Sequence, residues 1–339
     1  MFIKVLYMIL GFFLLIKGAD YLVKGASDIA KKLYIPQIII GLTIVSIGTS
    51  MPELIVSLNS AINNHSDIAI GNVIGSNISN LFLILGACAA IRPLKFKEET
   101  VRLEIPLVIF LTALLYIFGN NGGNIKQITK FEGLFLVICC ILFIIYNIYM
   151  AKKNNRILIA EKSCLNKTTD TINDDIKDNL DEISLPKSIL NILIGIIGLK
   201  LGGDLVVDSA SSIALMIGIS EKIIGLTIVA ISTSLPELIT SITATLRNEI
   251  DMAIGNVIGS NIFNIVLIVG ATALIRPIEY SISYNKDIVI LMIGMIALFV
   301  IPFIGEKNKI SRISGLAYVV SYLSYLASLV YINFWFINK

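Results

Sequence analysis

The sequence predicts an all-α membrane protein whose ten spanning helices form two inverted five-helix repeats, with breaks in the second and seventh helices. Three observations lead to this fold class. Hydrophobic residues make up 56% of the 339-residue chain. Apolar runs of about 20 residues, the length that crosses a bilayer as a helix, recur along it. One long stretch of the chain is also written twice.

The duplicated stretch contains two nearly identical blocks. Residues 41–53 return as 225–237, and residues 67–80 return as 251–264, so every position is shifted by 184. Twelve of the fourteen residues in the second block are identical in the two copies. The correspondence runs without a gap from residues 18–93 to residues 202–277. The chain is therefore a duplicated half-protein.

Each half supplies five predicted spans. They lie at residues 2–29, 37–62, 67–91, 101–119 and 130–150, and at 187–214, 219–246, 251–275, 284–304 and 311–336. Because five is an odd number, the two halves must enter the membrane from opposite sides, a construction common among secondary transporters. No small-residue cleavage pattern follows the first run, so we interpret it as a retained helix and not as a signal peptide.

The polar segments indicate orientation and domain organisation. Seventeen of the 27 Lys and Arg residues lie in loops that are cytoplasmic if both termini are outside. Residues 152–186 are a polar linker on that side, between the first repeat (1–151) and the second (187–339). Its acidic residues fit either a solvated linker or a regulatory cation site. The compact chain lacks organelle-targeting features, which indicates a prokaryotic plasma membrane.

Composition excludes several classes of function. A net charge of +3 does not indicate nucleic-acid binding. The cysteines, Cys88, Cys139, Cys140 and Cys164, lack ligand spacing and are interpreted as free thiols. No nucleophile–base pair or cofactor motif is present, so we expect neither an enzyme nor a cofactor. The sequence is compatible with a monomer.

A proline interrupts the same span in each half. Pro52 has no N–H for the carbonyl of Gly48, and Pro236 has none for Ser232, so each helix must kink or unwind there. Within lipid, a freed carbonyl survives only where it is buried in protein or lines a wet cavity. We therefore expect oxygen atoms of the residues before each proline to face such a cavity.

One glutamate follows each proline directly. A carboxylate at mid-membrane costs roughly 2.5 kcal/mol or more on insertion scales and usually marks a transport pathway. Glu53 and Glu237 stand at equivalent places, and neither repeated block holds a basic residue that could pair with them. Their counter-charge is predicted to be a mobile cation.

The third and eighth spans are expected to complete the site. Ser76 and Asn80 are four residues apart and share a helical face, as do Ser260 and Asn264. These residues fit two interpretations, close helix packing or oxygen ligands that face the glutamates. A site of carboxylate, hydroxyl, amide and carbonyl oxygens suits a hard cation such as Ca²⁺ or Na⁺.

These motifs resemble the two α-repeats of the sodium/calcium exchanger family, in the cation/Ca²⁺ antiporter superfamily. The resemblance is carried by residues 48–53 (Gly-Thr-Ser-Met-Pro-Glu) and 75–80 (Gly-Ser-Asn-Ile-Ser-Asn) with their second copies, and it extends over nearly the whole chain. The chain is most similar to the compact prokaryotic and archaeal members. The resemblance implies Na⁺/Ca²⁺ exchange by alternating access, in which spans one and six slide past a rigid core.

The resemblance also implies a ligand set. Glu53 and Glu237 would be shared between the Ca²⁺ and Na⁺ sites. The remaining implied ligands are the side chains of Ser50, Ser234, Ser76 and Ser260, those of Asn80 and Asn264 in the middle, and the backbone carbonyls of Ser46, Ala230, Thr49 and Thr233.

Asn264 departs from an archaeal member of the family, which has aspartate there. The asparagine leaves two carboxylates in the site and counts against K⁺ co-transport. Two other functions stay open: an H⁺/Ca²⁺ exchanger of the same superfamily, in which the glutamates carry protons, and a cation channel or membrane Ca²⁺-binding protein.

Overall fold

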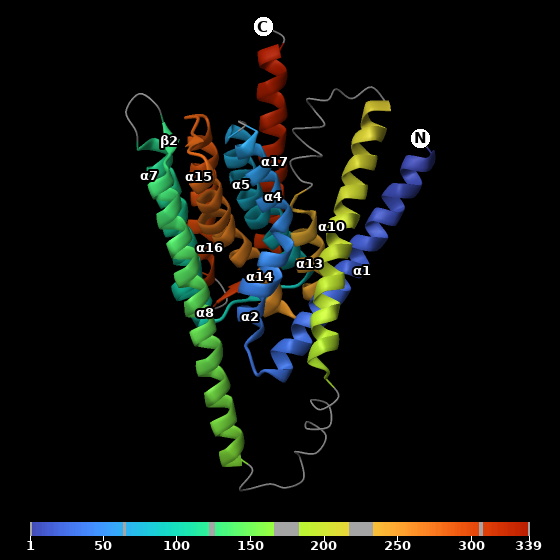
Figure 1. Ribbon diagram of the computed structural model, residues 1–339, viewed down its shortest axis with the longest axis vertical. Coiled ribbons are helices and arrows are strands. Elements are labelled where there is room, and N and C mark those ends of the chain that lie inside the picture. Colours follow the sequence, from blue (N-terminus) through green and yellow to red (C-terminus); the bar gives the residue numbers. More distant parts are fainter. Residues whose placement is uncertain are drawn as a thin grey trace.

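The computed structural model describes residues 2–63, 66–121, 126–165, 183–216, 233–304 and 308–337, and these residues are almost entirely helical. Figure 1 shows an elongated molecule in which both termini lie at one end. The long helix α8 (Lys130–Leu165) ends at the opposite end, and α10 (Leu185–Met216) begins there. The last helix of the first half and the first of the second half therefore both reach the end remote from the termini.

The helices of the first half begin with α1 (Phe2–Lys32). They continue with α2 (Gln37–Ile40), the π-helical segment η1 (Gly41–Val45), α3 (Ser46–Thr49), α4 (Met51–Ile62), α5 (Ser66–Ile78), η2 (Ser79–Leu85), α6 (Gly86–Ile91), η3 (Thr100–Glu104), α7 (Ile105–Asn120) and α8. The second half contains α10, α13 (Leu235–Leu246), α14 (Ile250–Phe263), η5 (Asn264–Val269), α15 (Gly270–Ile275), α16 (Tyr284–Ile304) and α17 (Arg312–Ile337).

Among the described residues, seven helical segments are long and apolar enough to cross a membrane. They are Phe2–Lys32, Ile68–Ile91, Thr100–Asn120, Lys130–Asn154, Leu185–Met216, Ile250–Ile275 and Tyr284–Phe303. The pair Gln37–Thr49 and Met51–Ile62, which is bent by 46°, makes an eighth if it is counted as one span. The chain is therefore a multi-pass membrane protein. α17, with 26 residues, lies outside this set, and serine and tyrosine recur along it.

Element boundaries repeat with the same offset as the sequence. The run from α5 to α6 spans residues 66–91 and the run from α14 to α15 spans 250–275, while η3 begins at residue 100 and α16 at 284. Two short antiparallel strand pairs also join the halves: β1 (Leu94–Lys95) pairs with β4 (Lys309–Ile310), and β2 (Gln127–Ile128) with β3 (Ile278–Glu279). These pairs, which the all-α prediction did not include, tie a connecting segment of each half to one of the other half.

The second span is interrupted where Pro52 predicts. Ser50 separates α3 from α4 with φ −84° and ψ 7°, and Pro52 occupies the first turn of α4, where its missing N–H has no helical partner to lose. Ser234 precedes α13 with φ −86° and ψ 3°, and Pro236 lies in the first turn there. The two glutamate-bearing helices therefore start in the same way.

The structure differs from the sequence-based prediction at the linker. The fifth span was expected to end at residue 150, but α8 continues to Leu165. A polar composition does not distinguish a solvated helix from an irregular linker. The acidic residues of the linker between Asp170 and Glu182 lie outside the described residues, as do Ala230 and the rest of the seventh span before residue 233.

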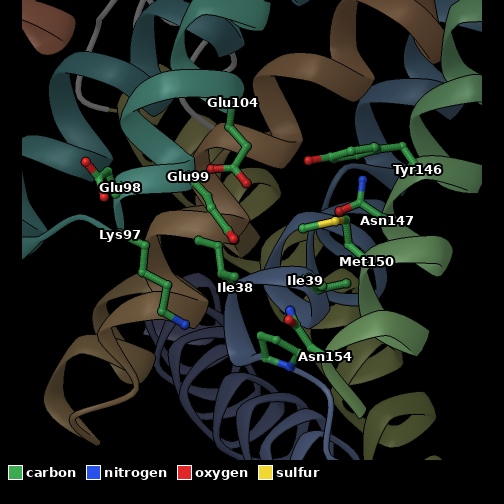
Figure 2. A pocket seen from close by; sticks show the side chains of 11 residues that line it. Ile38, Ile39, Lys97, Glu98, Glu99, Glu104, Tyr146, Asn147, Met150 and Asn154 are labelled. Carbon is green, nitrogen blue, oxygen red and sulfur yellow. The ribbon is translucent and has the colours of Figure 1, made fainter. Parts of the chain in front are cut away.

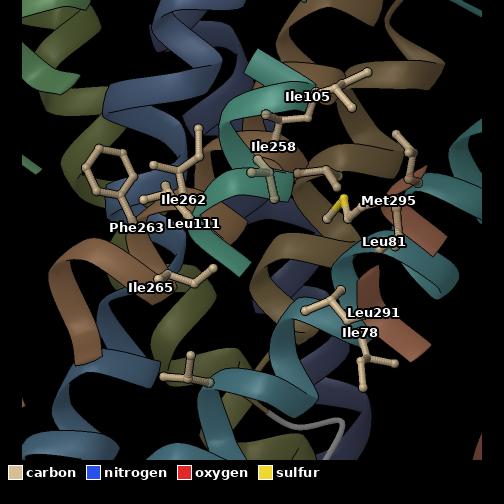
Figure 3. Packing of buried hydrophobic residues seen from close by; sticks show 14 of the residues in the cluster. Ile78, Leu81, Ile105, Leu111, Ile258, Ile262, Phe263, Ile265, Leu291 and Met295 are labelled. Atoms are coloured by element: carbon tan, nitrogen blue, oxygen red, sulfur yellow. The ribbon is translucent and has the colours of Figure 1, made fainter. Parts of the chain in front are cut away.

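Two separate apolar clusters hold the helices together. The larger joins α5 and η2 to α7, α14, η5 and α16, and Figure 3 shows Ile78 and Leu81 packing beside Leu291 and Met295. The smaller centres on α1 and α10, which lie side by side (Figure 1). Glycines bring this pair together: a Cβ on Gly18 would lie 2.7 Å from the backbone nitrogen of Leu199. The α1–α10 pair thus packs in a cluster apart from the larger one, and residues of α2, η1, α13 and α14 complete this smaller cluster.

Candidate functional site

The first turns of α4 and α13 carry the two glutamates. Glu53 and Glu237 are each only 1% exposed. Each stands in the first helical turn, where unpaired backbone N–H groups and the helix dipole favour negative charge. The proline break therefore does two things at once, since it opens the helix and supplies a positive helix end beside the carboxylate.

The two halves meet at these carboxylates. The hydroxyl of Ser50 donates a hydrogen bond of 2.9 Å to Oε1 of Glu237, which belongs to the other half. On the opposite side, Thr233 contacts Glu53, and the two carboxylates lie close enough to interact electrostatically. Among the described residues no Lys or Arg forms an ion pair with either glutamate. The centre thus brings together two carboxylates without a protein counter-charge.

Helices α5 and α14, with the π-helical segments that follow, supply the neutral oxygens. Ser76, Asn80, Ser260 and Asn264 are all buried, at 1% exposure or less. The amide nitrogen of Asn264 donates to Oδ1 of Asn77 at 2.9 Å, which leaves its own Oδ1 for another partner. The π-helical turns begin at Ser79 and Asn264, and such turns often occur at functional sites.

Buried oxygens without a hydrogen-bond partner concentrate in the predicted site. They include one carboxylate oxygen of each glutamate, the hydroxyls of Ser234 and Ser260, and the amide oxygens of Asn80 and Asn264. Leaving such an atom unsatisfied costs about 1–3 kcal/mol, and more if it is charged. The glutamate and asparagine oxygens stand on matching positions of both halves, the two hydroxyls belong to the second half, and such oxygens are what a hard cation would coordinate. The donor set fits Na⁺ or Ca²⁺.

Asn72 and Asn256, which the sequence analysis did not select, tie the site together. The amide nitrogen of Asn72 donates to the hydroxyl of Ser57 (3.1 Å) and to the backbone oxygen of Glu53 (3.3 Å). Its Oδ1 accepts a bond of 3.3 Å from Thr233 of the other half. The side chain therefore fixes one glutamate helix and reaches the break of the other.

Asn256 makes the matching three contacts in the second half. It donates to Ser241 (2.9 Å) and to the backbone oxygen of Glu237 (3.5 Å), and it accepts from Thr49 (3.2 Å). The signal that could have found both asparagines was available, because Gly-Asn-Val-Ile-Gly-Ser-Asn stands identically in both copies.

The structure describes only some of the backbone carbonyls that the resemblance implies as ligands. The carbonyl of Ser46 already accepts bonds from the Ser50 N–H (3.0 Å) and the Thr49 hydroxyl (3.3 Å). Thr233 is described, with its hydroxyl 3.5 Å from that of Ser76, whereas Ala230 lies outside the described residues.

Three acidic residues of the repeated stretch have structural partners. Asp20 pairs with Arg247 at 2.5 Å, Asp204 with Lys200 at 2.8 Å, and Asp251 with Lys97 at 2.7 Å. Cys88, Cys139 and Cys140 are free thiols, as predicted.

Fold and site together define a class of protein: a multi-pass membrane transporter with a buried cluster of oxygen atoms between two related halves. The sequence profile described as "Sodium/calcium exchanger protein" matches residues 3–149 and 187–331, one match in each half. The chain belongs to the sodium/calcium exchanger family of cation antiporters.

Known proteins agree with this assignment. The chain is 32% identical to the sodium/calcium exchanger MaX1 of Methanosarcina acetivorans over 97% of its own length and 99% of that protein. It is 34% identical to the inner membrane protein YrbG of Escherichia coli, with 96% of each chain covered. The solved structure of the sodium-calcium exchanger NCX_Mj, soaked with Na⁺ and Ca²⁺, superposes with a TM-score of 0.77 at 31% identity, covering 96% of this chain and 98% of that one.

Proposed function

We propose that this protein exchanges Na⁺ for Ca²⁺ across the membrane, by alternating access and with competition at one shared site. The observation that carries the proposal is the set of six unsatisfied oxygens around Glu53 and Glu237. Two carboxylates without a basic partner require positive charge from elsewhere, and hydroxyl and amide oxygens complete a coordination shell for hard cations.

Competition follows from the charge of the site. One Ca²⁺ neutralises the two carboxylates, and because Na⁺ uses the same glutamates, the two ions cannot fill the site together. A site without a cation holds two bare carboxylates, whose desolvation opposes passage through an occluded state. Na⁺ transport and Ca²⁺ transport are therefore coupled at the shared site itself, and no conformational signal between distant sites is required. An exchange of three Na⁺ for one Ca²⁺ moves net charge.

The ligand roles are part of this proposal. Glu53 and Glu237 serve both ions, with the backbone carbonyls of Thr49 and Thr233 added for Ca²⁺. The Na⁺ ligands are the hydroxyls of Ser50, Ser234, Ser76 and Ser260 with the carbonyls of Ser46 and Ala230, and the middle of the site is completed by Asn80 and Asn264. The unsatisfied hydroxyls of Ser234 and Ser260 support these positions.

The moving unit is the α1–α10 pair. Its apolar cluster is separate from the larger one, although residues of α2, η1, α13 and α14 also belong to it, and the glycine-mediated contact lets the two helices travel together. The proposal includes ten spans in two inverted repeats, with α2–α4 and α13 belonging to the two broken spans. Both termini lie outside the cell, which agrees with their position at one end of the molecule (Figure 1) and with the Lys/Arg bias of the opposite loops.

Uptake of ⁴⁵Ca²⁺ into proteoliposomes tests the proposal. We expect uptake driven by an outward Na⁺ gradient and unaffected by a protonophore. Uptake driven only by an outward H⁺ gradient would instead assign the protein to H⁺/Ca²⁺ exchange, and a unitary conductance in planar bilayers would make it a channel.

Variants of the two glutamates test the shared site. Glu53→Gln and Glu237→Gln should each abolish Na⁺-driven Ca²⁺ uptake, because each removes a carboxylate that both ions need. Glu98→Gln is the matched control, since Glu98 is exposed and paired with Arg102. Appreciable exchange in either site variant would exclude the shared-carboxylate mechanism.

A further inference from the structure

A second acidic cavity lies away from the glutamate pair. Its volume is about 520 Å³, and it opens where the start of α2, the segment leading into η3, and α8 meet. Figure 2 shows its lining, with Glu99 and Glu104 on one wall and Tyr146 and Asn147 of α8 on the other. None of these residues belongs to the proposed transport site, which is built on α3–α5, η2, α13, α14 and η5.

The charges that line this cavity do not balance. Lys97 lines it, but its ammonium lies 2.7 Å from Asp251 of α14. Glu98 is held by Arg102 at 2.6 Å, and Figure 2 shows it on the far side of the wall. The other two carboxylates of the lining are those of Glu99 and Glu104, and neither forms an ion pair with a described residue.

Glu104 provides the main evidence that this cavity holds a ligand. Its side chain is buried, with 8% of the residue exposed, and its Oε2 has no hydrogen-bond partner in the described part of the chain. In Figure 2 its carboxylate points into the cavity toward that of Glu99, and the two interact electrostatically. A buried carboxylate with a free oxygen needs a compensating group. Glu104 also ends the π-helical segment η3, a geometry that often marks functional positions.

The opposite wall offers neutral oxygens. The amide nitrogen of Asn147 donates to the carbonyl of Phe143 at 2.8 Å, one turn back in α8, so its amide oxygen stays available. The ring of Tyr146 brings a hydroxyl to the same space, close enough to interact electrostatically with both glutamates. Two carboxylates, an amide oxygen and a phenol oxygen are hard ligands.

We propose that this cavity binds a divalent cation, Ca²⁺, between Glu99 and Glu104, with Asn147 and Tyr146 as further ligands. A cation there joins the start of the α7 helix to α8. It is independent of the transport site and is tested with that site disabled.

Equilibrium binding of ⁴⁵Ca²⁺ to purified full-length protein is the test. In a Glu53→Gln, Glu237→Gln background we expect saturable binding to remain. Adding Glu104→Gln should weaken it by about tenfold or more, because the charge count of the ligands sets Ca²⁺ affinity. Glu98→Gln is the matched control and should change the affinity by less than about twofold, since an exposed ion pair contributes little.

Two outcomes would overturn the proposal: no saturable binding in the double-glutamine background, or equal binding with and without Glu104→Gln. Glu99→Gln provides a second variant if Glu104→Gln fails to fold, since Glu99 is exposed. Tb³⁺ supplies an independent readout of position. Its tyrosine-sensitised emission in the same background should fall on Tyr146→Phe, and unchanged emission would place the ion elsewhere.

Discussion

Replacement of Asn256 by alanine is expected to destabilise the protein by roughly 3–5 kcal/mol. The change removes three buried contacts between helices, to Thr49, Ser241 and the backbone of Glu237. Interhelical hydrogen bonds in membranes average about 0.6 kcal/mol and reach about 1.7. Three of them therefore account for roughly 2 kcal/mol, and the hydroxyl left buried without its partner adds about 1–3 kcal/mol.

Asn72→Ala is the matched control, because Asn72 makes the same three contacts in the other half. Asn256 is 1% exposed, whereas Asn72 is only partly buried, so water can replace part of what is lost there. We expect Asn72→Ala to cost about 1–2 kcal/mol, less than Asn256→Ala.

Reversible unfolding in mixed detergent micelles measures both variants. A double-mutant cycle that adds Thr49→Val to Asn256→Ala should show coupling of about 0.5–1 kcal/mol, the part carried across the two halves. Equal losses for the two alanine variants, within about 0.5 kcal/mol, would refute the argument from burial. Zero coupling would refute the link between the halves.

Three further predictions concern the helix pair, the site and the surface. Gly18→Ala should lower the free energy of unfolding by about 1–3 kcal/mol, because the added Cβ would contact the backbone of α10. Gly203→Ala is the control and should be neutral or stabilising, because its Cβ would have no atom within 4 Å. Thermal unfolding measures both variants. Ser50→Ala removes a 2.9 Å bond to a carboxylate and should raise the Na⁺ concentration for half-maximal exchange by about tenfold; an unchanged value would contradict its role. Asp20→Asn breaks the half-exposed ion pair with Arg247, and unfolding should change by less than about 1 kcal/mol, and less still at high salt.

The sequence best predicted those structural features that depend on residues within a single helix. Apolar runs predicted the seven described helical segments that are long enough to cross a membrane, and the proline rule predicted the position of the bend between α3 and α4. The constant offset of the repeat also carried over to the boundaries of the structure, since α5 and α14 begin 184 residues apart, at 66 and 250. These features depend on hydrophobicity and local backbone chemistry, which a single sequence records directly.

Helical periodicity does not determine which residue of another helix a side chain contacts. It did not predict that the hydroxyl of Ser50 donates to Glu237 of the other half. It also left open whether the polar residues of the third span were packing or ligands, and it did not select Asn72, whose three partners lie on two other helices. Composition equally failed to predict that α8 continues to Leu165, because a solvated helix and a linker share a polar composition.

The sequence by itself determined that this protein is a duplicated membrane protein with one carboxylate beside a proline break in each half. Hydrophobic length and the geometry of proline act locally, so no tertiary information was needed. Only the tertiary structure decided that the two glutamate helices begin next to one another, that each half completes the other's polar contacts, and that Glu104 faces a separate cavity. These are contacts between helices far apart in sequence, and they follow from how the helices pack.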